Sequence, residues 1–168
     1  ANAIKIQTYT SETMTLDCKK EDFILSSGTL WDGISLYELY KKAFTPWEWH
    51  AELFEYARKI GIDIFSSPFD KTAVDFLEQF SPSAYKIASF EITDYDLIRY
   101  TAKKGKPMII STGIASKSDI NLALKTCYDV GNEQIILLKC TSSYPASIKE
   151  ANLCMINEFK NDFGCYTG

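Results

Sequence analysis

The sequence predicts an α/β fold and, within that class, an incomplete parallel barrel of strands and helices. Short apolar segments alternate with helical segments, and small polar residues or lysines follow the apolar segments. The chain has 168 residues, whereas a closed barrel of eight strand–helix units needs about 200 or more. We therefore expect a single incomplete barrel domain over residues 1–168.

The strands are expected where apolar and β-branched residues cluster between turn signals. In chain order these segments are Ala3–Gln7, Asp63–Ser66, Ala84–Ile87, Met108–Ser111, Ile135–Cys140 and the beginning of a sixth at Cys165–Gly168. The uninterrupted alternation with helices predicts a parallel sheet in sequence order, with the helices on one side only.

Capping residues and glycines indicate the helix boundaries. Helices are expected to begin at Thr45-Pro46-Trp47-Glu48, Asp70, Thr93-x-x-Asp96, Ser116-x-x-Asp119 and Ser147-x-x-Glu150, and to close at Gly61, Gly105 and Gly131. Residues Thr10–Leu36 interrupt this rhythm. We expect a long loop there, which either covers a site or is only surface.

A complete, doubly wound, flavodoxin-like domain of five strands is the alternative fold. Such a domain concentrates its site at one switch point of the sheet. Here polar residues follow successive strands, as in Phe65-Ser66-Ser67-Pro68 and Ile110-Ser111-Thr112-Gly113. This distribution favours the barrel, whose active site is built from the carboxyl ends of many strands.

Composition excludes several classes of function. The net charge of −4 argues against a nucleic-acid partner, and no apolar run is long enough to span a membrane. The five cysteines are odd in number and widely spaced, which favours reduced thiols in the cytoplasm over disulfides or zinc. The one histidine, His50, lies within an expected helix, so we assign it a structural role.

Two lysines and a glutamate are the strongest candidates for chemistry. Lys5 and Lys86 interrupt apolar strands, where a lysine is costly unless it is paired or binds an anion; the alternative is a lysine that extends to the open strand end. Ser89 and Glu91 are expected to point together, because alternate residues of a strand share a face. Glu91 is a proton-transfer candidate, or simply a glutamate favoured at a helix N-terminus.

The remaining candidates offer hydrogen bonds at strand ends. Ser67, Ser111 and Thr112 could serve a ligand, although strand-to-helix turns use the same residue types. Gln7 shares a strand face with Lys5. Cys140 is expected to be a buried and inert thiol within a strand.

Taken in order, these motifs resemble the sialic acid synthase family, which condenses phosphoenolpyruvate with an amino sugar. The resemblance is carried by Lys5-Ile6-Gln7-Thr8, Phe65-Ser66-Ser67-Pro68-Phe69, Tyr85-Lys86-Ile87-Ala88-Ser89-Phe90-Glu91, Ser111-Thr112-Gly113 and Lys139-Cys140-Thr141-Ser142-Ser143-Tyr144-Pro145. Leu30-Trp31-Asp32 and Thr45-Pro46-Trp47-Glu48-Trp49-His50 resemble the pseudaminic acid synthase branch. The alternatives within the family are N-acetylneuraminate and legionaminic acid synthases.

The resemblance implies roles for particular residues. Phosphoenolpyruvate would contact Lys5, Ser67, Lys86, Ser89, Ser111, Thr112 and Ser142, the sugar would contact Gln7 and Tyr144, and Glu91 and Lys86 would be catalytic. The chain would comprise about strands 2 to 6 of the barrel and the start of strand 7. The family's first strand, last barrel strands and C-terminal antifreeze-like domain have no counterpart in these residues.

The resemblance also implies a divalent metal, Mn²⁺ in the full-length enzyme, held by histidines of segments that have no counterpart here. No metal ligand is therefore expected in this sequence. The full-length enzyme is expected to be a homodimer, and this piece alone is expected to be inactive. The alternative of another class is a non-catalytic binding module, derived from a barrel or flavodoxin-like.

Overall fold

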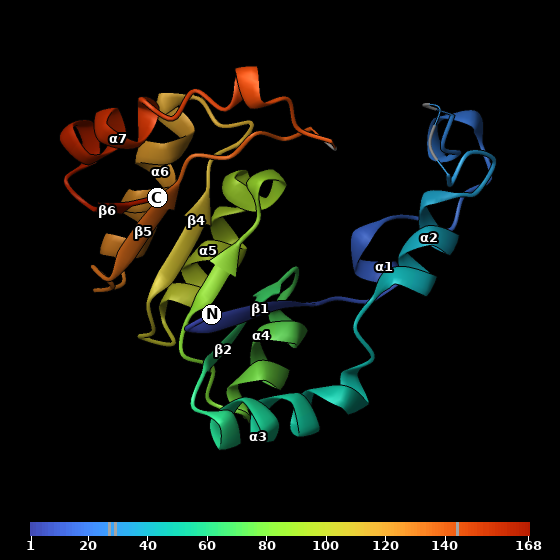
Figure 1. The fold of residues 1–168 in the computed structure, drawn as a ribbon, viewed down its shortest axis with the longest axis horizontal. Helices are drawn as coiled ribbons and strands as arrows, with labels where there is room; N and C mark the ends of the chain where they lie inside the picture. The colour runs from blue at the N-terminus through green and yellow to red at the C-terminus, as the bar shows by residue number, and fades with distance from the viewer. Residues whose placement is uncertain (27, 29, 144) are drawn as a thin grey trace.

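The fold is built on a six-stranded parallel sheet whose strands lie side by side in chain order, β1-β2-β3-β4-β5-β6 (Figure 1). This computed structural model describes residues 1–26, 28, 30–143 and 145–168. The predicted strand order is confirmed. Because the order never reverses, the doubly wound alternative is wrong and the partial barrel is supported.

The strands are short and agree closely with the predicted segments. They are β1 (Ala3–Thr8), β2 (Asp63–Pro68), β3 (Tyr85–Ile87), β4 (Met108–Ser111), β5 (Ile135–Leu138) and β6 (Tyr166–Thr167). The largest differences are of two residues: β2 ends two residues after the predicted end and β5 two residues before it. Lys139 and Cys140 therefore follow the strand and do not belong to it.

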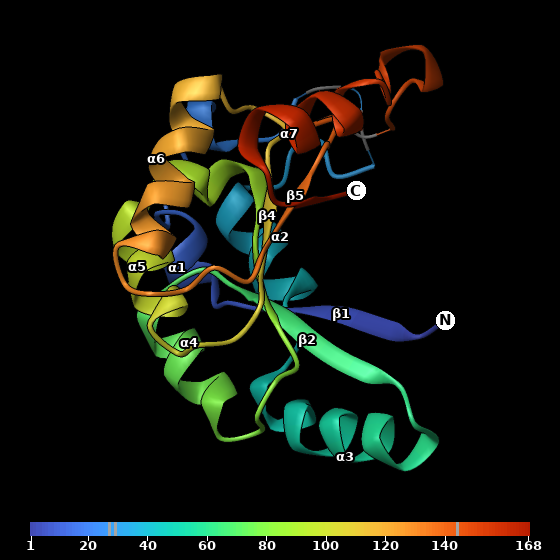
Figure 2. The same ribbon diagram turned by 90° about the vertical axis from the view of Figure 1, so that its left-hand side faces the viewer.

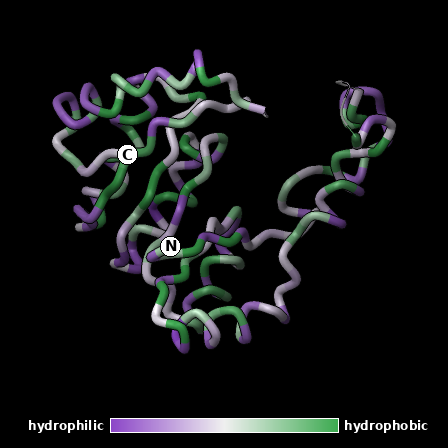
Figure 3. Tube along the Cα trace, viewed as in Figure 1, coloured by the Kyte–Doolittle hydropathy of each residue, from purple (hydrophilic) through white to green (hydrophobic). Residues whose placement is uncertain are grey.

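One face of the sheet is covered by helices, and we call it the outer face. Helices α4 (Lys71–Glu78), α5 (Tyr95–Ala102) and α6 (Lys117–Tyr128) run along it (Figure 2). Alternate strand residues point into this core and are at most 6% exposed: Ile64, Tyr85, Ile87, Met108, Ile110, Ile135 and Leu137. In Figure 3 these strands are hydrophobic over much of their length.

The helices at the two ends of the sheet share this core. Phe54 of α3 (His50–Ile60) and Phe159 of α7 (Met155–Phe163) pack in the same cluster as the strand residues. All five helices of the strand–helix units therefore lie on one side, as predicted. On the opposite face, which we call the inner face, none of the described residues forms such a helical layer. Within the described part of the chain, no helix has the length and apolar character needed to cross a bilayer.

Several helix boundaries follow the predicted capping chemistry. The Asp70 carboxylate accepts the N–H of Ala73 at 2.7 Å, and Ser116 forms a reciprocal capping box with Asp119 at the start of α6. Gly61 ends α3 with a positive φ of 71°, which a glycine adopts without steric cost.

Three predicted helix starts are wrong. Helix α5 begins one residue later than expected, because Asp94 and not Thr93 is the cap and accepts the N–H of Leu97 at 2.9 Å. The segments after Thr45 and Ser147 begin as 3-10 turns, and α3 and α7 start further along the chain. Helix ends often form 3-10 turns, and a boundary shift of one or two residues is common there.

The predicted loop after β1 has structure of its own. It contains α1 (Ser11–Met14) and a 3-10 turn at Glu21–Phe23 and continues into α2 (Leu36–Ala43). The Tyr37 hydroxyl donates to the Glu12 carboxylate at 2.6 Å and ties α2 to α1. We call the described residues between 10 and 45, which exclude 27 and 29, the excursion. It extends beyond the carboxyl end of β1, away from the helical layer (Figure 1).

Candidate functional site

The inner face collects the polar residues that the sequence singled out. Because Ile64, Ile87 and Ile110 point into the helical core, alternation turns Ser67, Lys86 and Ser111 to the inner face. On β1, Ile6 packs against the core and so Lys5 and Gln7 face inward. Gln7 lies opposite Ser67 in the parallel register. The structure thus brings candidates from β1, β2, β3 and β4 to one surface.

Two lysines make this surface cationic. Lys86 is half-buried, and its pKa lies below the ordinary value because burial removes water and because the charge of Lys5 is close by. Lys5 is more exposed than the sequence suggested, although partial burial still lowers its pKa. The expectation of a buried cation is therefore met by Lys86 and is wrong for Lys5. Two ammonium groups in mutual repulsion favour an anion between them.

Glu91 lies close to the charge of Lys86. It lies in the 3-10 turn Ser89–Thr93, half-buried, with Oε2 buried and without a hydrogen-bond partner among the described residues. Burial raises the pKa of Glu91, while Lys86 acts in the opposite direction. A carboxyl group with a raised pKa beside an ammonium group is a candidate for proton transfer.

The predicted reason for the placement of Ser89 and Glu91 is wrong. Both lie beyond β3 in a 3-10 turn, where side chains two residues apart do not share a face as they do in a strand. Ser89 is instead fixed by the next strand end, since its Oγ accepts the N–H of Gly113 at 3.2 Å.

Two buried hydroxyls have no partner. Ser67 and Ser111 are each 1% exposed, and their Oγ atoms make no hydrogen bond within the described residues. Leaving a buried hydroxyl unsatisfied costs about 1–3 kcal/mol. Such a cost on the inner face, beside Lys86 and Glu91, indicates a site for a polar ligand.

The last three predicted contacts differ in what they can offer. The Thr112 hydroxyl donates to the carbonyl of Leu138 at 2.9 Å, so its proton is already used and an anion would find no donor there. Ser142 is exposed after β5. Tyr144 lies outside the described residues.

His50 is a structural residue, as predicted, but its partners were not foreseen. It is fully buried at the start of α3 and packs edge-on against Phe76. Nδ1 lies 3.2 Å from the carbonyl of Pro46, which assigns the proton to Nδ1, and Nε2 accepts the Thr8 hydroxyl at 2.8 Å. Thr8 in turn lies 2.8 Å from Ser66 Oγ. Burial lowers the pKa of His50 and keeps it neutral. This network links α3 to β1 and β2 on the outer face of the sheet. It thereby fixes the two strands that carry Gln7 and Ser67 on the inner face.

Sequence reasoning also missed Cys140 as a neighbour of the site. The expectation of a buried strand thiol is wrong, since Cys140 follows β5 and is only half-buried. It lies close enough to Lys86 for its thiolate form to raise the pKa of that lysine. Alternation gave a signal for this position, because Ile135 and Leu137 point into the core and residues 136, 138 and 140 therefore follow the inner face.

The described residues do not assemble a metal centre. Among them, no group of three or more histidine, cysteine, aspartate or glutamate side chains could hold an ion. Glu91 Oε2 is an available oxygen ligand, but a divalent cation such as Mn²⁺ needs several oxygen or imidazole ligands.

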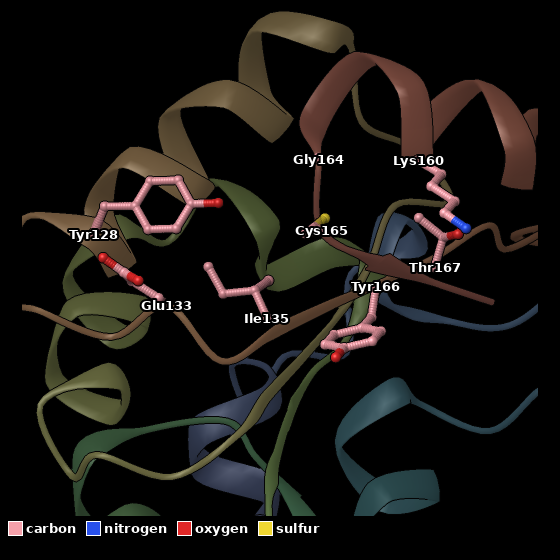
Figure 4. Close-up of a pocket in the computed structure, with 8 residues that line it drawn as sticks. All are labelled: Tyr128, Glu133, Ile135, Lys160, Gly164, Cys165, Tyr166 and Thr167. Carbon is pink, nitrogen blue, oxygen red and sulfur yellow. The ribbon is translucent and has the colours of Figure 1, made fainter.

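A separate pocket of about 800 Å³ lies away from these residues (Figure 4). It is lined by Tyr128, Glu133, Ile135, Lys160, Gly164, Cys165, Tyr166 and Thr167. Ile135 is the first residue of β5, so this pocket is at the amino ends of the strands. In barrels that end of the sheet contributes stability and the carboxyl ends contribute chemistry. We therefore place the candidate site on the inner face near the carboxyl ends.

The sheet in chain order, the one-sided helices and the polar carboxyl ends define a βα-barrel type of protein. The NeuB family is matched over residues 1–168, and the chain belongs to this family. The predicted membership of the sialic acid synthase family is thus confirmed.

Individual relatives agree with this assignment. The chain is 51% identical to pseudaminic acid synthase of Helicobacter pylori over all of its 168 residues, which are 49% of that protein. It is 32% identical to N,N'-diacetyllegionaminic acid synthase of Legionella pneumophila, over 97% of the chain and 47% of that protein. A crystal structure of N-acetylneuraminic acid synthetase from Leptospira borgpetersenii matches the whole chain with a TM-score of 0.84 and 30% identity, and the match covers 53% of that structure. The chain therefore spans about half the length of these relatives.

Proposed function

We propose that the protein carrying this sequence is a synthase that condenses phosphoenolpyruvate with an amino sugar resembling 2,4-diacetamido-2,4,6-trideoxy-altrose, giving pseudaminic acid and phosphate. The observation that carries the proposal is the inner-face pair of Lys5 and Lys86 beside Glu91, in a chain 51% identical to a pseudaminic acid synthase. Surface glycan biosynthesis in the cytoplasm is the corresponding setting, and free thiols agree with a reducing compartment.

The residues divide into anion binding and sugar binding. Phosphoenolpyruvate carries a phosphate and a carboxylate, so it needs cations and several hydrogen-bond donors. Lys5 and Lys86 supply the charge. The donors are Ser67, Ser89, Ser111 and Ser142, with Thr112 acting only as an acceptor unless its bond to Leu138 breaks. Gln7 and Tyr144 are assigned to the sugar.

The proposed reaction forms one carbon–carbon bond and replaces the carbon–oxygen bond to phosphate at C2 with one to the oxygen of water. The methylene carbon of phosphoenolpyruvate attacks the aldehyde carbon of the open-chain sugar, and the aldehyde oxygen takes a proton. Water adds to the resulting cation at C2 and loses a proton, and phosphate then leaves with the bridging oxygen. Glu91, with its raised pKa, would stabilise the cation or accept the water proton, and Lys86 would hold the anionic groups.

A divalent metal, Mn²⁺, is part of the proposal for the full-length enzyme, where it would activate the sugar aldehyde. The described donors do not suffice for it, and no step above depends on it. We also propose that the full-length protein is a homodimer, which light scattering would test.

The test is an isotope experiment on the full-length protein that carries this sequence. Phosphoenolpyruvate labelled with ¹⁸O in the bridging position should transfer the label to phosphate, because the carbon–oxygen bond breaks. Label retained in the sugar product would contradict the mechanism. Parallel assays with N-acetylmannosamine and the legionaminic acid precursor distinguish the related synthases by their kcat/KM.

A non-catalytic binding module is the second candidate, and the unpaired hydroxyls of Ser67 and Ser111 are compatible with it. It would bind phosphoenolpyruvate without releasing phosphate from any of the three sugars. Equilibrium binding measured beside the phosphate assay separates the two functions.

A further inference from the structure

Gly113 differs from the six glycines that have a positive φ, because close neighbours and not the backbone exclude a side chain there. At Gly61, as at the other glycines with positive φ, the backbone is left-handed and a Cβ would meet nothing within 4 Å. Gly113, directly after β4, has no such backbone, so another residue could adopt its conformation. The requirement for glycine must come from close neighbours.

Those neighbours are two serines that follow the adjacent strands. A Cβ on Gly113 would collide with Oγ of Ser142, which follows β5, and would lie 2.9 Å from Oγ of Ser89, which follows β3. Cys140 Cβ would be 3.4 Å away. Gly113 is therefore the point at which the carboxyl ends of three strands meet.

The same contact orients a hydroxyl. The N–H of Gly113 donates to Ser89 Oγ at 3.2 Å. Because that bond occupies a lone pair of Ser89 and leaves its O–H unused, the hydroxyl can donate to a ligand. Ser142 has no hydrogen bond to another described residue through its side chain, so its O–H is equally available.

We infer that Gly113 is a positioning residue, which lets the hydroxyls of Ser89 and Ser142 converge on one anionic group of the substrate. The inference rests on the proposed function, since it takes that anion to belong to phosphoenolpyruvate. A methyl group at position 113 separates the two hydroxyls without removing either, and Lys86 still supplies its charge.

The experiment measures the Kd of phosphoenolpyruvate by calorimetry on the full-length protein, with G113A, S142A and the double variant. We expect G113A to weaken binding by roughly tenfold, the effect of losing a hydrogen bond to a charged group. In the S142A background the same substitution should cost less than about threefold, because its main collision is gone. The KM for the sugar should stay unchanged.

Gly61→Ala is the matched control, because it lowers the melting temperature through its backbone and should leave the Kd unchanged. Equal binding by G113A and the unaltered protein, or full additivity with S142A, overturns the inference alone. Absence of binding by the unaltered protein overturns the proposed function as well. If G113A does not fold, the double variant should fold and bind within about threefold of S142A, since the contact with Ser89 Oγ remains. A double variant that also fails to fold overturns the inference.

Discussion

The outer and inner faces of the sheet come from alternate residues of the same strands, yet they treat polar atoms in opposite ways. On the outer face the one large polar side chain among the core residues, Tyr85, donates its hydroxyl to Glu78 at 2.7 Å. On the inner face the buried hydroxyls of Ser67 and Ser111 have no hydrogen-bond partner among the described residues, and Lys86 is near another cation. Buried polar groups with hydrogen-bond partners are typical of the face that stabilises the fold, and buried polar groups without partners indicate the face that binds a ligand.

The largest expected effect is on the outer face. Ile87→Ala should lower the free energy of unfolding by about 2–5 kcal/mol, because it leaves a cavity at a fully buried position. Urea unfolding of the full-length protein measures this loss. Ile136→Ala, at a half-buried inner-face position, is the control and should cost clearly less. Equal losses would mean that the two faces are packed alike.

Lys86→Met should have the opposite result to Ile87→Ala, a loss of ligand affinity without a loss of stability. We expect the Kd of phosphoenolpyruvate to rise by roughly 10- to 150-fold, as for a lost hydrogen bond to a charged group of about 1.5–3 kcal/mol. Stability should be unchanged or higher, because burial and Lys5 disfavour the charged amine in the folded protein. Lys117→Met is the control, since Lys117 pairs with Asp162 on the surface at 2.7 Å. A similar loss of affinity in both variants would point to non-specific electrostatics.

Glu91→Gln tests the inner face through the pH dependence of the free energy of unfolding. Because burial raises the pKa of Glu91 in the folded protein, ionising it costs stability as pH rises from 4.5, its ordinary value, through the raised pKa. Glu91→Gln should therefore be more stable than the unaltered protein at pH 7.5, and the gain should vanish below pH 4.5. Urea unfolding across this range measures it, with exposed Glu55→Gln as the control. A variant that is less stable at pH 7.5 would show that the carboxylate is satisfied.

The smallest effect concerns the helices that cover the outer face. Asp94→Ala should cost about 1 kcal/mol, because the cap of α5 is lost. Thr93→Ala, at the cap that the sequence alone suggested, should stay within about 0.5 kcal/mol. Thermal unfolding of both variants decides between the two positions.

The sequence alone predicted the order of the strands and most residues of the inner face, because strand alternation and the residue types at strand ends are local properties. Lys86 is an example, because its apolar neighbours Tyr85 and Ile87 point into the core and Lys86 therefore faces the other side of the sheet. What it missed depends on three dimensions. Ser89 lies in a 3-10 turn after β3 and not in the expected strand geometry, and the close approach at Gly113 involves three separate strand ends.

Strict alternation in β3 also decides which genetic changes the chain can survive. Substitutions at Tyr85, Lys86 or Ile87 alter one face at a time. Deletion of the Tyr85 codon would shift the register by one residue, bringing Lys86 into the hydrophobic core and Ile87 to the inner face. Both stability and chemistry would fail together. Variation in length should therefore be confined to the excursion and the other connections, while the strands vary only by replacement.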